Sequence, residues 1–489
     1  MTKAVRALAA MLVAGCAARH APQPVSPAVS RLAARLDSVF AGADFSRAAW
    51  GVVVQSLANG EVLYRRDAGR LFMPASNQKI LTGAVALARL GPAFRWVTPV
   101  LAAGPRHGDT LSGDLVVSGR GDPTISLHAA GGDDPLGPLR PWADSVRARG
   151  IRVVDGAVVG EGTWFRGPAL GQGWMWDDLA DSYSAPVGAL EFNEGFAVLE
   201  ATPGARSGDS VRLRLLPSSA PLRLVSTATT APADSGVNTL RATRALAGDS
   251  VSVWGRLSAA HAPARFEISV RDPAAYFAAA LAQALREAGI VVTLRPRGRP
   301  SAADTLFTWS SPRLDSTLKL LAKPSQNQIA EALLRTIGAV ARGTASMDSG
   351  RAALRETLRG WGVSDDAYVY ADASGLSRYD YVAPEAIAAV LAGIARDSSF
   401  AAFYDALPVA GVDGTLEDRM RGTAAQGNAR AKTGSISNVR TLSGYVTTRD
   451  GERLLFVLMA NHFTAPGRTA TTAQDRVVAL LAGFSRSGR

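Results

Sequence analysis

The 489-residue sequence contains a single cysteine, Cys16, so no disulfide bond can form within the chain. It also lacks any run of five or more basic residues, although its formal net charge is +11. Scattered positive charge indicates a solvated basic surface, or attraction to an anionic cell envelope. A nucleic-acid interface needs the charge concentrated in a patch or stripe, and we therefore expect no nucleic-acid partner.

Histidine is scarce, and its positions argue against two common kinds of catalytic site. The five histidines show no spacing typical of a catalytic triad or a metal site: His20, His107, His128, His261 and His462. The sequence also contains no Gly-x-Ser-x-Gly motif, which presents the nucleophile in many serine hydrolases. We expect neither a metal nor another cofactor.

The N-terminal apolar segment is too short to span a membrane as a mature helix. Ala4 to Ala14 is mostly apolar and begins among the basic residues Lys3 and Arg6, as in a secretory signal. It runs into Val13-Ala14-Gly15-Cys16, where small residues before a cysteine resemble a bacterial lipoprotein cleavage site. The alternative is a plain secretory signal with a cysteine close to the cut.

On the lipoprotein interpretation, residues 1–16 comprise the signal and the lipidation residue Cys16, and residues 17–27 form a Pro/Ala tether. The protein would then be periplasmic in a bacterial envelope and held to the membrane only by its lipid. Ala17 is not the aspartate that retains lipoproteins at the inner membrane in some bacteria, which favours the outer membrane. No other stretch of the sequence is suited to cross a membrane.

A length of 489 residues predicts about three domains, and 47% hydrophobic with 19% charged residues predicts a folded chain. Strands are predicted near both ends of the chain, at Trp50 to Leu57, Glu61 to Arg65, Ala431 to Ser435, Arg440 to Thr448 and Arg453 to Ala460. Asn59-Gly60 and Asp450-Gly451 are strong hairpin turns between neighbouring strands. The two ends of the chain are therefore expected to share one sheet.

Helical periodicity fills most of the remaining sequence outside the middle of the chain. It predicts helices at Val29 to Phe40, Ser76 to Leu90, Leu314 to Ala322, Gln328 to Val340, Gly350 to Trp361 and Thr469 to Phe484. Strands at both ends with helices between them indicate an α+β domain formed by residues 28–102 and 296–489.

Residues 103–295 differ from the rest in having short strand-like segments between many turns. These segments are Leu115 to Ser118, Val153 to Val159, Val211 to Leu216, Val251 to Leu257 and Phe266 to Val270. A helix predicted at Ala274 to Gly289 would lead back to the first domain. We interpret this region as a mostly-β insertion of two small domains.

Three short motifs carry the candidate chemistry: Ser76-Asn77-Gln78-Lys79, Ser325-Gln326-Asn327 and Lys432-Thr433-Gly434. A spacing of three on a helix places Ser76 and Lys79 on one face. A serine hydroxyl is a weak nucleophile that needs a base, and a lysine becomes one when burial or a nearby cation such as Lys432 lowers its pKa. In this order the motifs predict a serine acyl-transfer site.

The second motif, Ser325-Gln326-Asn327, precedes a predicted helix and allows two interpretations. Ser325 is a good N-cap, and Gln328 stands three residues further on, as in a capping box. Alternatively, the Ser325 hydroxyl relays a proton to a leaving amine and Asn327 hydrogen-bonds a substrate amide. The two interpretations are compatible, because the start of a helix can face a cleft.

The third motif, Lys432-Thr433-Gly434-Ser435, falls on a predicted strand. It is either an ordinary exposed strand end or a substrate-binding edge. On the second interpretation Lys432 and Thr433 hold a substrate carboxylate, and Gly434 lets the backbone come close. The N–H groups of Ser76 and Ser435 would form an oxyanion hole, in which one donor is worth about 3–4 kcal/mol.

With their surroundings, the motifs resemble the D-alanyl-D-alanine carboxypeptidase/endopeptidase family, the class C or type-4 low-molecular-mass penicillin-binding proteins. Further segments that carry the resemblance are residues 73–78, 121–123, 176–186, 372–378 and 407–416. The resemblance covers roughly residues 30–485. It implies an α/β (α+β) fold of the penicillin-binding-protein and serine β-lactamase type, with a five-stranded antiparallel sheet flanked by helices and inserted mostly-β domains.

The resemblance also implies a role for each motif. Ser76 would be the acylated nucleophile and Lys79 its base, while Ser325 and Asn327 complete a proton relay and bind the peptide. The remaining implied contacts to the substrate are Lys432, Thr433, Gly434 and Ser435 at its terminal carboxylate and carbonyl, and Asp178, Tyr183 and Arg378 at its diaminopimelate side chain. Gln326 replaces the Asp of the family motif and is expected to point away from the chemistry.

The implied function is a serine-type D-Ala-D-Ala carboxypeptidase and DD-endopeptidase. It would act on peptidoglycan stem peptides through an acyl-enzyme at Ser76, and β-lactam antibiotics would be covalent inhibitors. One alternative is a serine β-lactamase, for which the sequence offers no extra carboxylate motif to activate the deacylating water. The other is a non-catalytic envelope-binding lipoprotein, although every motif residue needed for catalysis is present.

Overall fold

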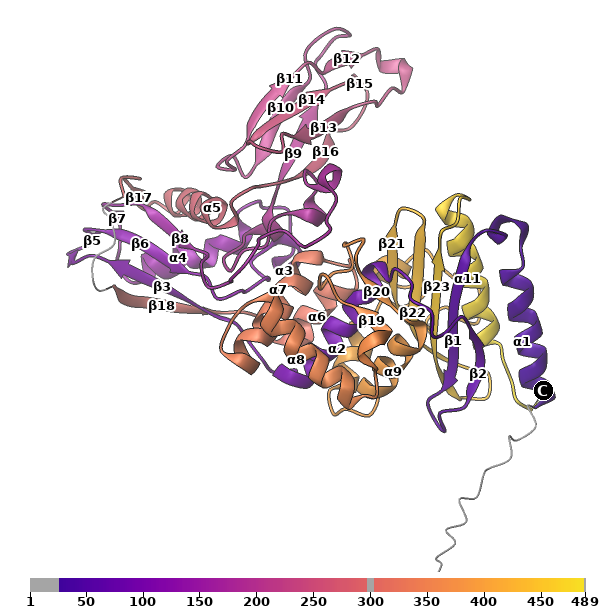
Figure 1. The fold of residues 1–489 in the computed structure, drawn as a ribbon. Coiled ribbons are helices and arrows are strands. Elements are labelled where there is room, and N and C mark those ends of the chain that lie inside the picture. Colours follow the sequence, from indigo (N-terminus) through magenta and orange to yellow (C-terminus); the bar gives the residue numbers. More distant parts are fainter. Residues whose placement is uncertain (1–25, 297–302, 488–489) are drawn as a thin grey trace, which may run out of the picture.

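The computed structural model describes residues 26–296 and 303–487. Figure 1 shows a base, in which a sheet and a group of helices lie side by side, and an extension built from the middle of the chain. Residues 1–16 and most of the expected 17–27 tether, Cys16 included, lie outside the described ranges. Within those ranges no helix combines the length and apolar character needed to cross a membrane.

The base contains one antiparallel sheet of five strands made from both ends of the chain. Its order is β2 (Val62–Arg66), β1 (Ala49–Ser56), β23 (Arg453–Asn461), β22 (Val439–Thr447) and β21 (Arg430–Ile436). Gly60 and Gly451 adopt positive φ in the turns of the two hairpins, as the sequence predicts. The expected five-stranded antiparallel sheet is confirmed.

The sheet is buried on both faces, and its alternating side chains enter two different cores. Trp50, Leu442 and Phe456 pack beneath α1 (Pro27–Phe40) and α11 (Gly467–Ala482). Val53, Tyr445 and Val457 face the helical half of the base. This explains why β23 reads as a continuous apolar run, since a central strand covered on both sides has no solvent-facing positions.

The helical half of the base surrounds α2 (Gln78–Leu90), which is buried along nearly its whole length. The helices around it are α6 (Leu314–Ala322), α7 (Asn327–Arg342), α8 (Met347–Gly360), α9 (Pro384–Ile394) and α10 (Phe400–Ala406). A short hairpin, β19 (Tyr368–Val369) and β20 (Tyr381–Val382), closes this side. Helices α9 and α10 were not predicted, although the apolar content of α9 fits its place against β23 and β1.

The extension leaves the base through two long paired strands, β3 (Val97–Ala103) and β18 (Asp304–Ser310). They form a sheet with β6 (Asp114–Ser118) and β8 (Val158–Glu161). The junctions therefore lie near residues 97 and 310, outside the expected limits 103 and 295. Trp96 anchors the departing strand, because its Nε1 donates to Thr336 Oγ1 at 3.0 Å in the helical half.

The part of the extension next to the base is mixed α/β and not mostly β. Its helices are α3 (Leu127–Ala130), α4 (Arg140–Ala148) and α5 (Pro273–Glu287), and its second small sheet contains β4 (Arg106–His107), β5 (Thr110–Leu111), β7 (Val153–Val154) and β17 (Val291–Val292). The helix expected at Ala274 to Gly289 exists as α5, but it does not lead back to the base. Its Tyr276 and Phe277 pack with Trp142 in the core of the extension. Strands β17 and β18 come after α5 in the chain, and β18 is the element that returns to the base.

The outer part of the extension is all β and has its own small core. Its strands are β9 (Phe196–Thr202), β10 (Arg212–Leu216), β11 (Arg223–Ser226), β12 (Thr229–Ala231), β13 (Arg241–Arg244), β14 (Ser250–Trp254), β15 (Arg256–Ser258) and β16 (Ala264–Ser269). Two segments expected as single strands are each broken in two: Val153 to Val159 gives β7 and β8, and Val251 to Leu257 gives β14 and β15. Gly255, at φ +103°, separates the second pair.

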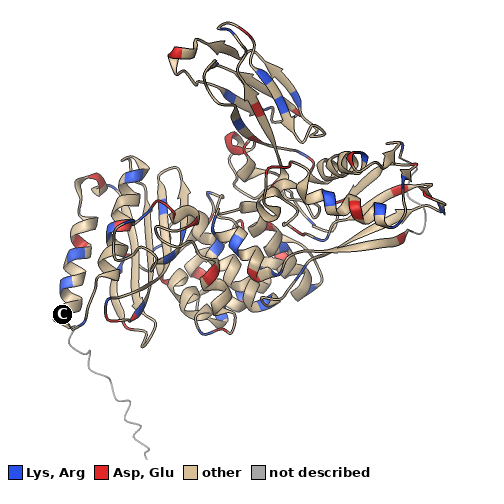
Figure 2. Cartoon of the chain, turned by 180° about the vertical axis from the view of Figure 1, so that it is seen from behind, with Lys and Arg blue, Asp and Glu red and all other residues tan. Residues whose placement is uncertain are grey.

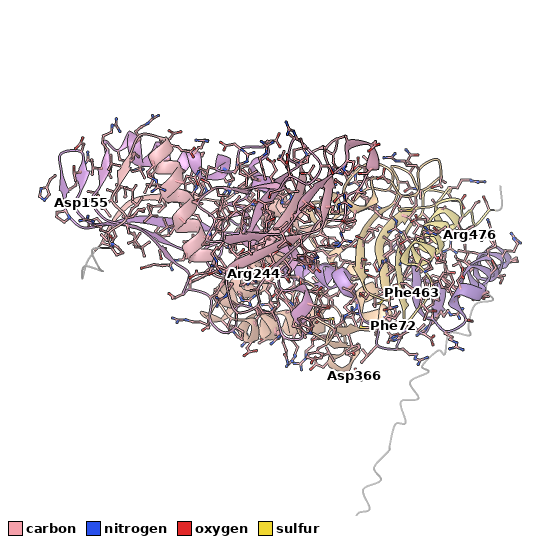
Figure 3. The ribbon with its side chains drawn as sticks, turned by 90° about the horizontal axis from the view of Figure 1, so that it is seen from above. Phe72, Asp155, Arg244, Asp366, Phe463 and Arg476 are labelled. Atoms are coloured by element: carbon pink, nitrogen blue, oxygen red, sulfur yellow. The ribbon has the colours of Figure 1, made fainter. Side chains whose placement is uncertain are left out.

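Charge is distributed over the whole molecule. Figure 2 shows basic and acidic residues interspersed on the base and the extension. One arginine is structural: Arg244, labelled in Figure 3, is buried and donates to the carbonyl oxygens of Ser269 at 2.8 Å and Leu179 at 2.9 Å. It thereby ties the outer β part to the segment that leads toward the base.

Replacing Phe456 by alanine tests the two-sided burial of the sheet. Phe456 is fully buried on the central strand, so we expect Phe456→Ala to cost about 3–5 kcal/mol and to lower the melting temperature of the base by several degrees. Calorimetry measures the shift. Val62→Ala on the exposed side of edge strand β2 is the control and should change little; equal melting temperatures for both variants would contradict the assignment.

Candidate active site

Ser76 lies where the sheet meets the helical half of the base, on a short 3₁₀ turn (Ala75–Asn77) that precedes α2. Ala75, just before it, has a positive φ of 45°, which is strained for a residue with a side chain. Two bonds hold the turn against β21 and β22: Asn77 Nδ2 donates to the Lys432 carbonyl and Thr441 Oγ1 to the Pro74 carbonyl, both at 2.8 Å. The nucleophile is thus fixed to the sheet edge.

Lys79 contacts both Ser76 and the second motif. Its Nζ donates to Ser76 Oγ at 2.9 Å, to Asn327 Oδ1 at 2.6 Å and to the Ser374 carbonyl at 2.8 Å. Each of these acceptors is neutral. The serine therefore has a nitrogen base within hydrogen-bond reach, as the three-residue spacing predicts.

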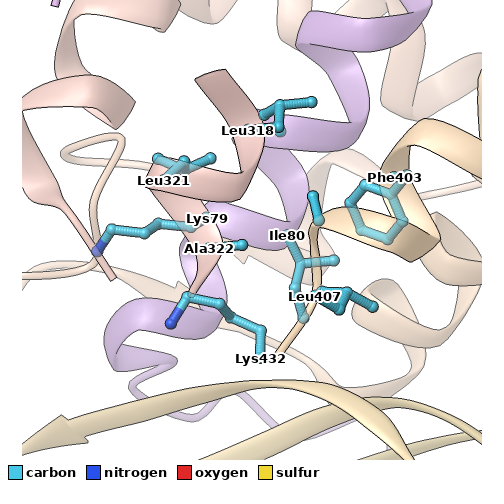
Figure 4. Close-up of a pocket in the computed structure, with 10 residues that line it drawn as sticks. Lys79, Ile80, Leu318, Leu321, Ala322, Phe403, Leu407 and Lys432 are labelled. Carbon is cyan, nitrogen blue, oxygen red and sulfur yellow. The ribbon is translucent and has the colours of Figure 1, made fainter. Parts of the chain in front are cut away.

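Burial lowers the pKa of Lys79 to about 7, with the carboxylates of Asp372, Glu331 and Asp380 opposing the shift from a distance. Figure 4 shows the cause: the stems of Lys79 and Lys432 lie against Ile80, Leu321 and other apolar side chains. A substantial fraction of Lys79 is thus the neutral amine at neutral pH. The sequence suggested Lys432 as a cation that lowers this pKa, but desolvation is the main cause.

Lys432 connects the third motif to the second. Its Nζ donates to Ser325 Oγ at 2.8 Å and to the carbonyl of Thr433 at 2.9 Å. The pKa of Lys432 is well below its usual range, first because the side chain is buried and second because Lys79 repels its charge. Each lysine thus donates a hydrogen bond to one serine of the site: Lys79 to Ser76, and Lys432 to Ser325.

The Ser325 hydroxyl is engaged with Lys432 and does not cap the following helix. Gln326, and not Ser325, is the N-cap residue of α7, and no side chain bonds to the first N–H groups of this helix. Gln328 uses its Nε2 on the carbonyls of Ser182 and Ala185. The capping-box interpretation is therefore wrong, because Ser325 at φ +70° turns its hydroxyl into the cleft.

The third motif needs its glycine. A Cβ on Gly434 would lie 2.1 Å from Thr441 Oγ1, 2.8 Å from the Pro74 carbonyl and 3.0 Å from the Ser76 amide nitrogen. Strand β21 therefore passes directly beside the nucleophile's N–H group, which suits an oxyanion hole shared with Ser435. Thr433 Oγ1 donates to Thr415 Oγ1 at 2.8 Å on the exposed side of the strand.

A cleft of about 440 Å³ opens in front of these groups. The cleft is lined by Ser76, Ser325, Asn327 and Ser435. It is also lined by the three side chains expected to bind the substrate's side chain, which are Asp178, Tyr183 and Arg378. Tyr183 donates its hydroxyl to Asp178 at 2.8 Å, and Arg378 donates to the carbonyl of Ser437 at 3.0 Å. All eleven residues that the sequence placed at or beside the reaction are therefore neighbours of one site; Cys16 lies outside the described residues.

Three buried carboxylates support the site, and none was predicted. Glu331 pairs with Arg335 at 3.1 Å and accepts from the N–H groups of Ala373 at 2.8 Å and Ser374 at 3.1 Å. Its pKa is raised, chiefly by burial and then by Asp372. By holding the N–H of Ser374, Glu331 positions the residue whose carbonyl accepts a hydrogen bond from Lys79 Nζ.

Asp372 and Asp380 hold the rest of this loop. Asp372 accepts from the N–H groups of Ser374, Gly375 and Ser377 at 3.0, 2.6 and 2.8 Å. Asp380 accepts from the N–H of Ala371 at 2.6 Å, and burial keeps its pKa well above the usual range. Two features of the sequence could have indicated these acids. Glu331 follows Asn327 by one helical turn, and Asp372 begins the Asp-Ala-Ser-Gly turn.

The described residues contain no group of three or more histidine, cysteine or acidic side chains arranged to hold a metal ion. The reactive groups of the site are two hydroxyls, two amines and one amide. This set can activate a serine, stabilise an oxyanion and return a proton to a leaving group. It is the equipment for acyl transfer through a covalent serine intermediate.

Comparisons with known proteins agree with this chemistry. The profile of the D-Ala-D-Ala carboxypeptidase 3 (S13) family matches residues 32–482. A D-alanyl-D-alanine carboxypeptidase of Actinomadura sp. (strain R39) is 35% identical over 469 residues, which is 92% of this chain and 84% of that protein. The D-alanyl-D-alanine carboxypeptidase DacB of Haemophilus influenzae is 26% identical and is covered to 88%, as is this chain.

Solved structures show the same fold. The crystal structure of penicillin binding protein 4 (dacB) from Haemophilus influenzae superposes with a TM-score of 0.76 at 26% identity, covering 92% of this chain and 97% of that one. The same protein complexed with a β-lactam gives a TM-score of 0.72 at 25% identity and the same coverage. The expected penicillin-binding-protein fold is confirmed, and the chain belongs to the D-Ala-D-Ala carboxypeptidase 3 (S13) family of serine-type peptidases.

Proposed function

We propose that this protein is a penicillin-sensitive D-Ala-D-Ala carboxypeptidase and DD-endopeptidase that cleaves peptidoglycan stem peptides through an acyl-enzyme on Ser76. The observation that carries the proposal is the Lys79 Nζ to Ser76 Oγ contact of 2.9 Å, made by a lysine whose pKa is about 7. A neutral amine at this distance can take the serine proton as the oxygen attacks. The family membership supplies the class of substrate.

In the acylation step Lys79 Nζ takes the Ser76 Oγ proton, and the oxygen attacks the carbonyl carbon of the penultimate D-Ala. The N–H groups of Ser76 and Ser435 receive the developing oxyanion. The C–N bond then breaks, and the leaving D-Ala amine receives, through Ser325, the proton that Lys79 removed from Ser76, so that Lys79 is again a neutral amine; Ser325 is hydrogen-bonded to Lys432 Nζ during this transfer. Water then attacks the ester while the neutral Lys79 accepts its proton, and Lys79 returns this proton to Ser76 Oγ as the C–O bond breaks and the shortened peptide leaves with a free carboxylate.

Different residues of the cleft suit the two ends of the substrate. Thr433 and Ser435 on β21 would hold the terminal carboxylate, whose negative charge would favour protonation of the buried Lys432 behind them. Asp178 and Tyr183 from the extension, and Arg378, which contacts Ser437 just beyond β21, present one acid, one phenol and one guanidinium to the cleft. This mixed set suits a zwitterionic side-chain end such as that of diaminopimelate, in which an ammonium and a carboxylate lie together.

The location of the protein is part of the proposal and depends on the sequence alone. We infer a lipoprotein of the bacterial envelope, anchored through Cys16, facing the periplasm and held by the outer membrane. The basis is the Val13-Ala14-Gly15-Cys16 segment and the absence of aspartate after the cysteine. A tether ending at Ser26, the N-cap of α1, would place the base nearest the membrane.

Benzylpenicillin tests the nucleophile. We expect intact mass spectrometry to find one long-lived penicilloyl adduct on the wild type and none on Ser76→Ala, because the Ser76 ester is the acyl-enzyme. Ser38→Ala, at an exposed serine on α1, is the control and should be labelled like the wild type. Rapid hydrolysis of the drug without an adduct would instead identify a β-lactamase.

The pH dependence of acylation tests the base. The neutral form of Lys79 rises from roughly one tenth at pH 6 to nine tenths at pH 8 for a pKa of about 7, so the acylation rate constant should increase about tenfold over this range. Lys79→Arg, which stays protonated, should lower the rate about 10²- to 10⁴-fold and abolish the increase.

Lys319→Arg, at an exposed lysine of α6, is the matched control for this measurement. Because arginine is larger and the site is buried, Lys79→Met serves as a second variant, with its melting temperature checked against the wild type. A rate that is flat between pH 6 and pH 8 in the wild type would contradict the assignment of Lys79 as the base.

The lipid anchor is tested by phase partition of the full-length protein expressed in a Gram-negative host. Wild-type protein should enter the detergent phase and carry the added mass of the acyl chains, whereas Cys16→Ala should stay in the aqueous phase. Ala17→Asp keeps the cysteine and should move the protein from the outer to the inner membrane fraction. If the wild-type protein stays in the aqueous phase, the lipoprotein interpretation is wrong and the N-terminal segment is a plain secretory signal.

A further inference from the structure

The extension reaches the second catalytic motif through a histidine. His128 lies on α3 (Leu127–Ala130), a single helical turn capped by Ser126. Its Nδ1 is 2.8 Å from Glu194 Oε2 and 3.3 Å from Nε2 of the Gln326 amide. Gln326 is the residue expected to point away from the chemistry, and its side chain contacts the extension.

A strained turn in the extension aims two side chains at α3. Asn193, Glu194 and Gly195 all have positive φ, between 50° and 76°, which is costly for the two residues with side chains. Asn193 Oδ1 accepts from the N–H of Leu127 at 3.3 Å, and Glu194 accepts from His128. The turn therefore fixes both the start of α3 and the orientation of its histidine ring.

The ring is held as a donor toward a buried acid. The hydrogen bond to Glu194, whose side chain is 1% exposed, raises the pKa of His128, and the nearby charge of Glu267 acts in the same direction. The Nδ1 proton therefore points to the carboxylate. Turning the Gln326 side-chain amide by half a turn exchanges its oxygen and nitrogen without moving the group. The amide oxygen then faces His128 and is a second acceptor for the Nδ1 proton.

Ser325, the serine of the second motif, directly precedes Gln326 in the chain. Ser325 has a left-handed backbone at φ +70°, and its Oγ accepts from Lys432 Nζ at 2.8 Å. Asn327 is already fixed, since Nδ2 donates to the Tyr183 carbonyl at 2.7 Å and Oδ1 accepts from Lys79. The Gln326 side chain is thus the contact that the extension makes next to Ser325.

We propose that His128, oriented by Glu194, is a positioning residue of the active site: through the Gln326 amide it keeps Ser325 in the strained conformation that presents its hydroxyl to Lys432 and to the leaving amine. The proposal rests on the proposed function, because the leaving amine is that of D-Ala. His128 touches no reacting atom. Its effect belongs to the leaving-group step, so it should appear in kcat and not in KM.

The test is D-Ala release from an acyl-D-Ala-D-Ala peptide by the purified protein. His128→Ala should lower kcat about 2- to 10-fold, the effect of losing one hydrogen bond, with KM and melting temperature unchanged. Gln326→Ala should cause a similar loss, and the double variant should be no slower than either single variant, because both remove one contact. His128→Asn, which retains an amide donor near the Nδ1 position, should restore most of the activity.

Two controls separate the possible failures. His107→Ala changes an exposed histidine on β4 of the same extension and should have no effect. Ser76→Ala in the same assay reports the proposed function itself: release by this variant equal to the wild type would show that the function is wrong. If Ser76→Ala is inactive but His128→Ala equals the wild type, or the effects of His128→Ala and Gln326→Ala multiply, the positioning role is overturned.

Discussion

The structure depends on keeping two lysines in an apolar site without a carboxylate bound to either. Lys79 and Lys432 are 2% and 1% exposed, and their hydrogen-bond partners among the described residues are hydroxyl, amide and carbonyl oxygens. Burial makes the charged form of each amine unfavourable, which is the property that a lysine base requires. A direct ion pair would have restored the ordinary pKa and removed the base, so the acids of the site must be nearby but occupied elsewhere.

That requirement explains the three buried carboxylates. The oxygens of Glu331, Asp372 and Asp380 accept hydrogen bonds from backbone N–H groups of the loop at residues 371–377. Glu331 also pairs with Arg335. They act on Lys79 only through space, which moderates the fall of its pKa to about 7. The same bonds press the loop against the nucleophile: a Cβ on Gly375, which has φ +82°, would lie 1.8 Å from the Ala75 carbonyl. The acids thus set the geometry and the electrostatics together.

The sequence was sufficient for what is local and insufficient for what arises from assembly. Periodicity and the two Gly turns placed the sheet strands and the base helices other than α9 and α10 within a few residues, and a spacing of three correctly paired Ser76 with Lys79. The engagement of Ser325 could not be read locally, because a serine before a helix is normally a cap. Only the hydrogen bond from Lys432, over one hundred residues away in the sequence, shows that its hydroxyl belongs to the site. The buried acids were missed for the same reason, and α5 was assigned to the wrong unit because periodicity does not say which core a helix joins.

The extension is best understood as a wall of the active site. Tyr183 supplies a carbonyl to Asn327, Trp174 donates its indole N–H to Asp372 at 2.7 Å, and the Gln172 carbonyl accepts from Ser377. Both reactive serines sit on strained backbone, at Ala75 and at Ser325, and such strain persists only where the surroundings fix it. The base alone fixes the first through β22 and the Gly375 loop. The second is held from both parts of the molecule: Lys432 of the base donates to Ser325, and Gln326, Asn327 and Gln328 contact the extension. The roughly 200 residues inserted between the first and second motifs therefore help to fix the geometry of this segment.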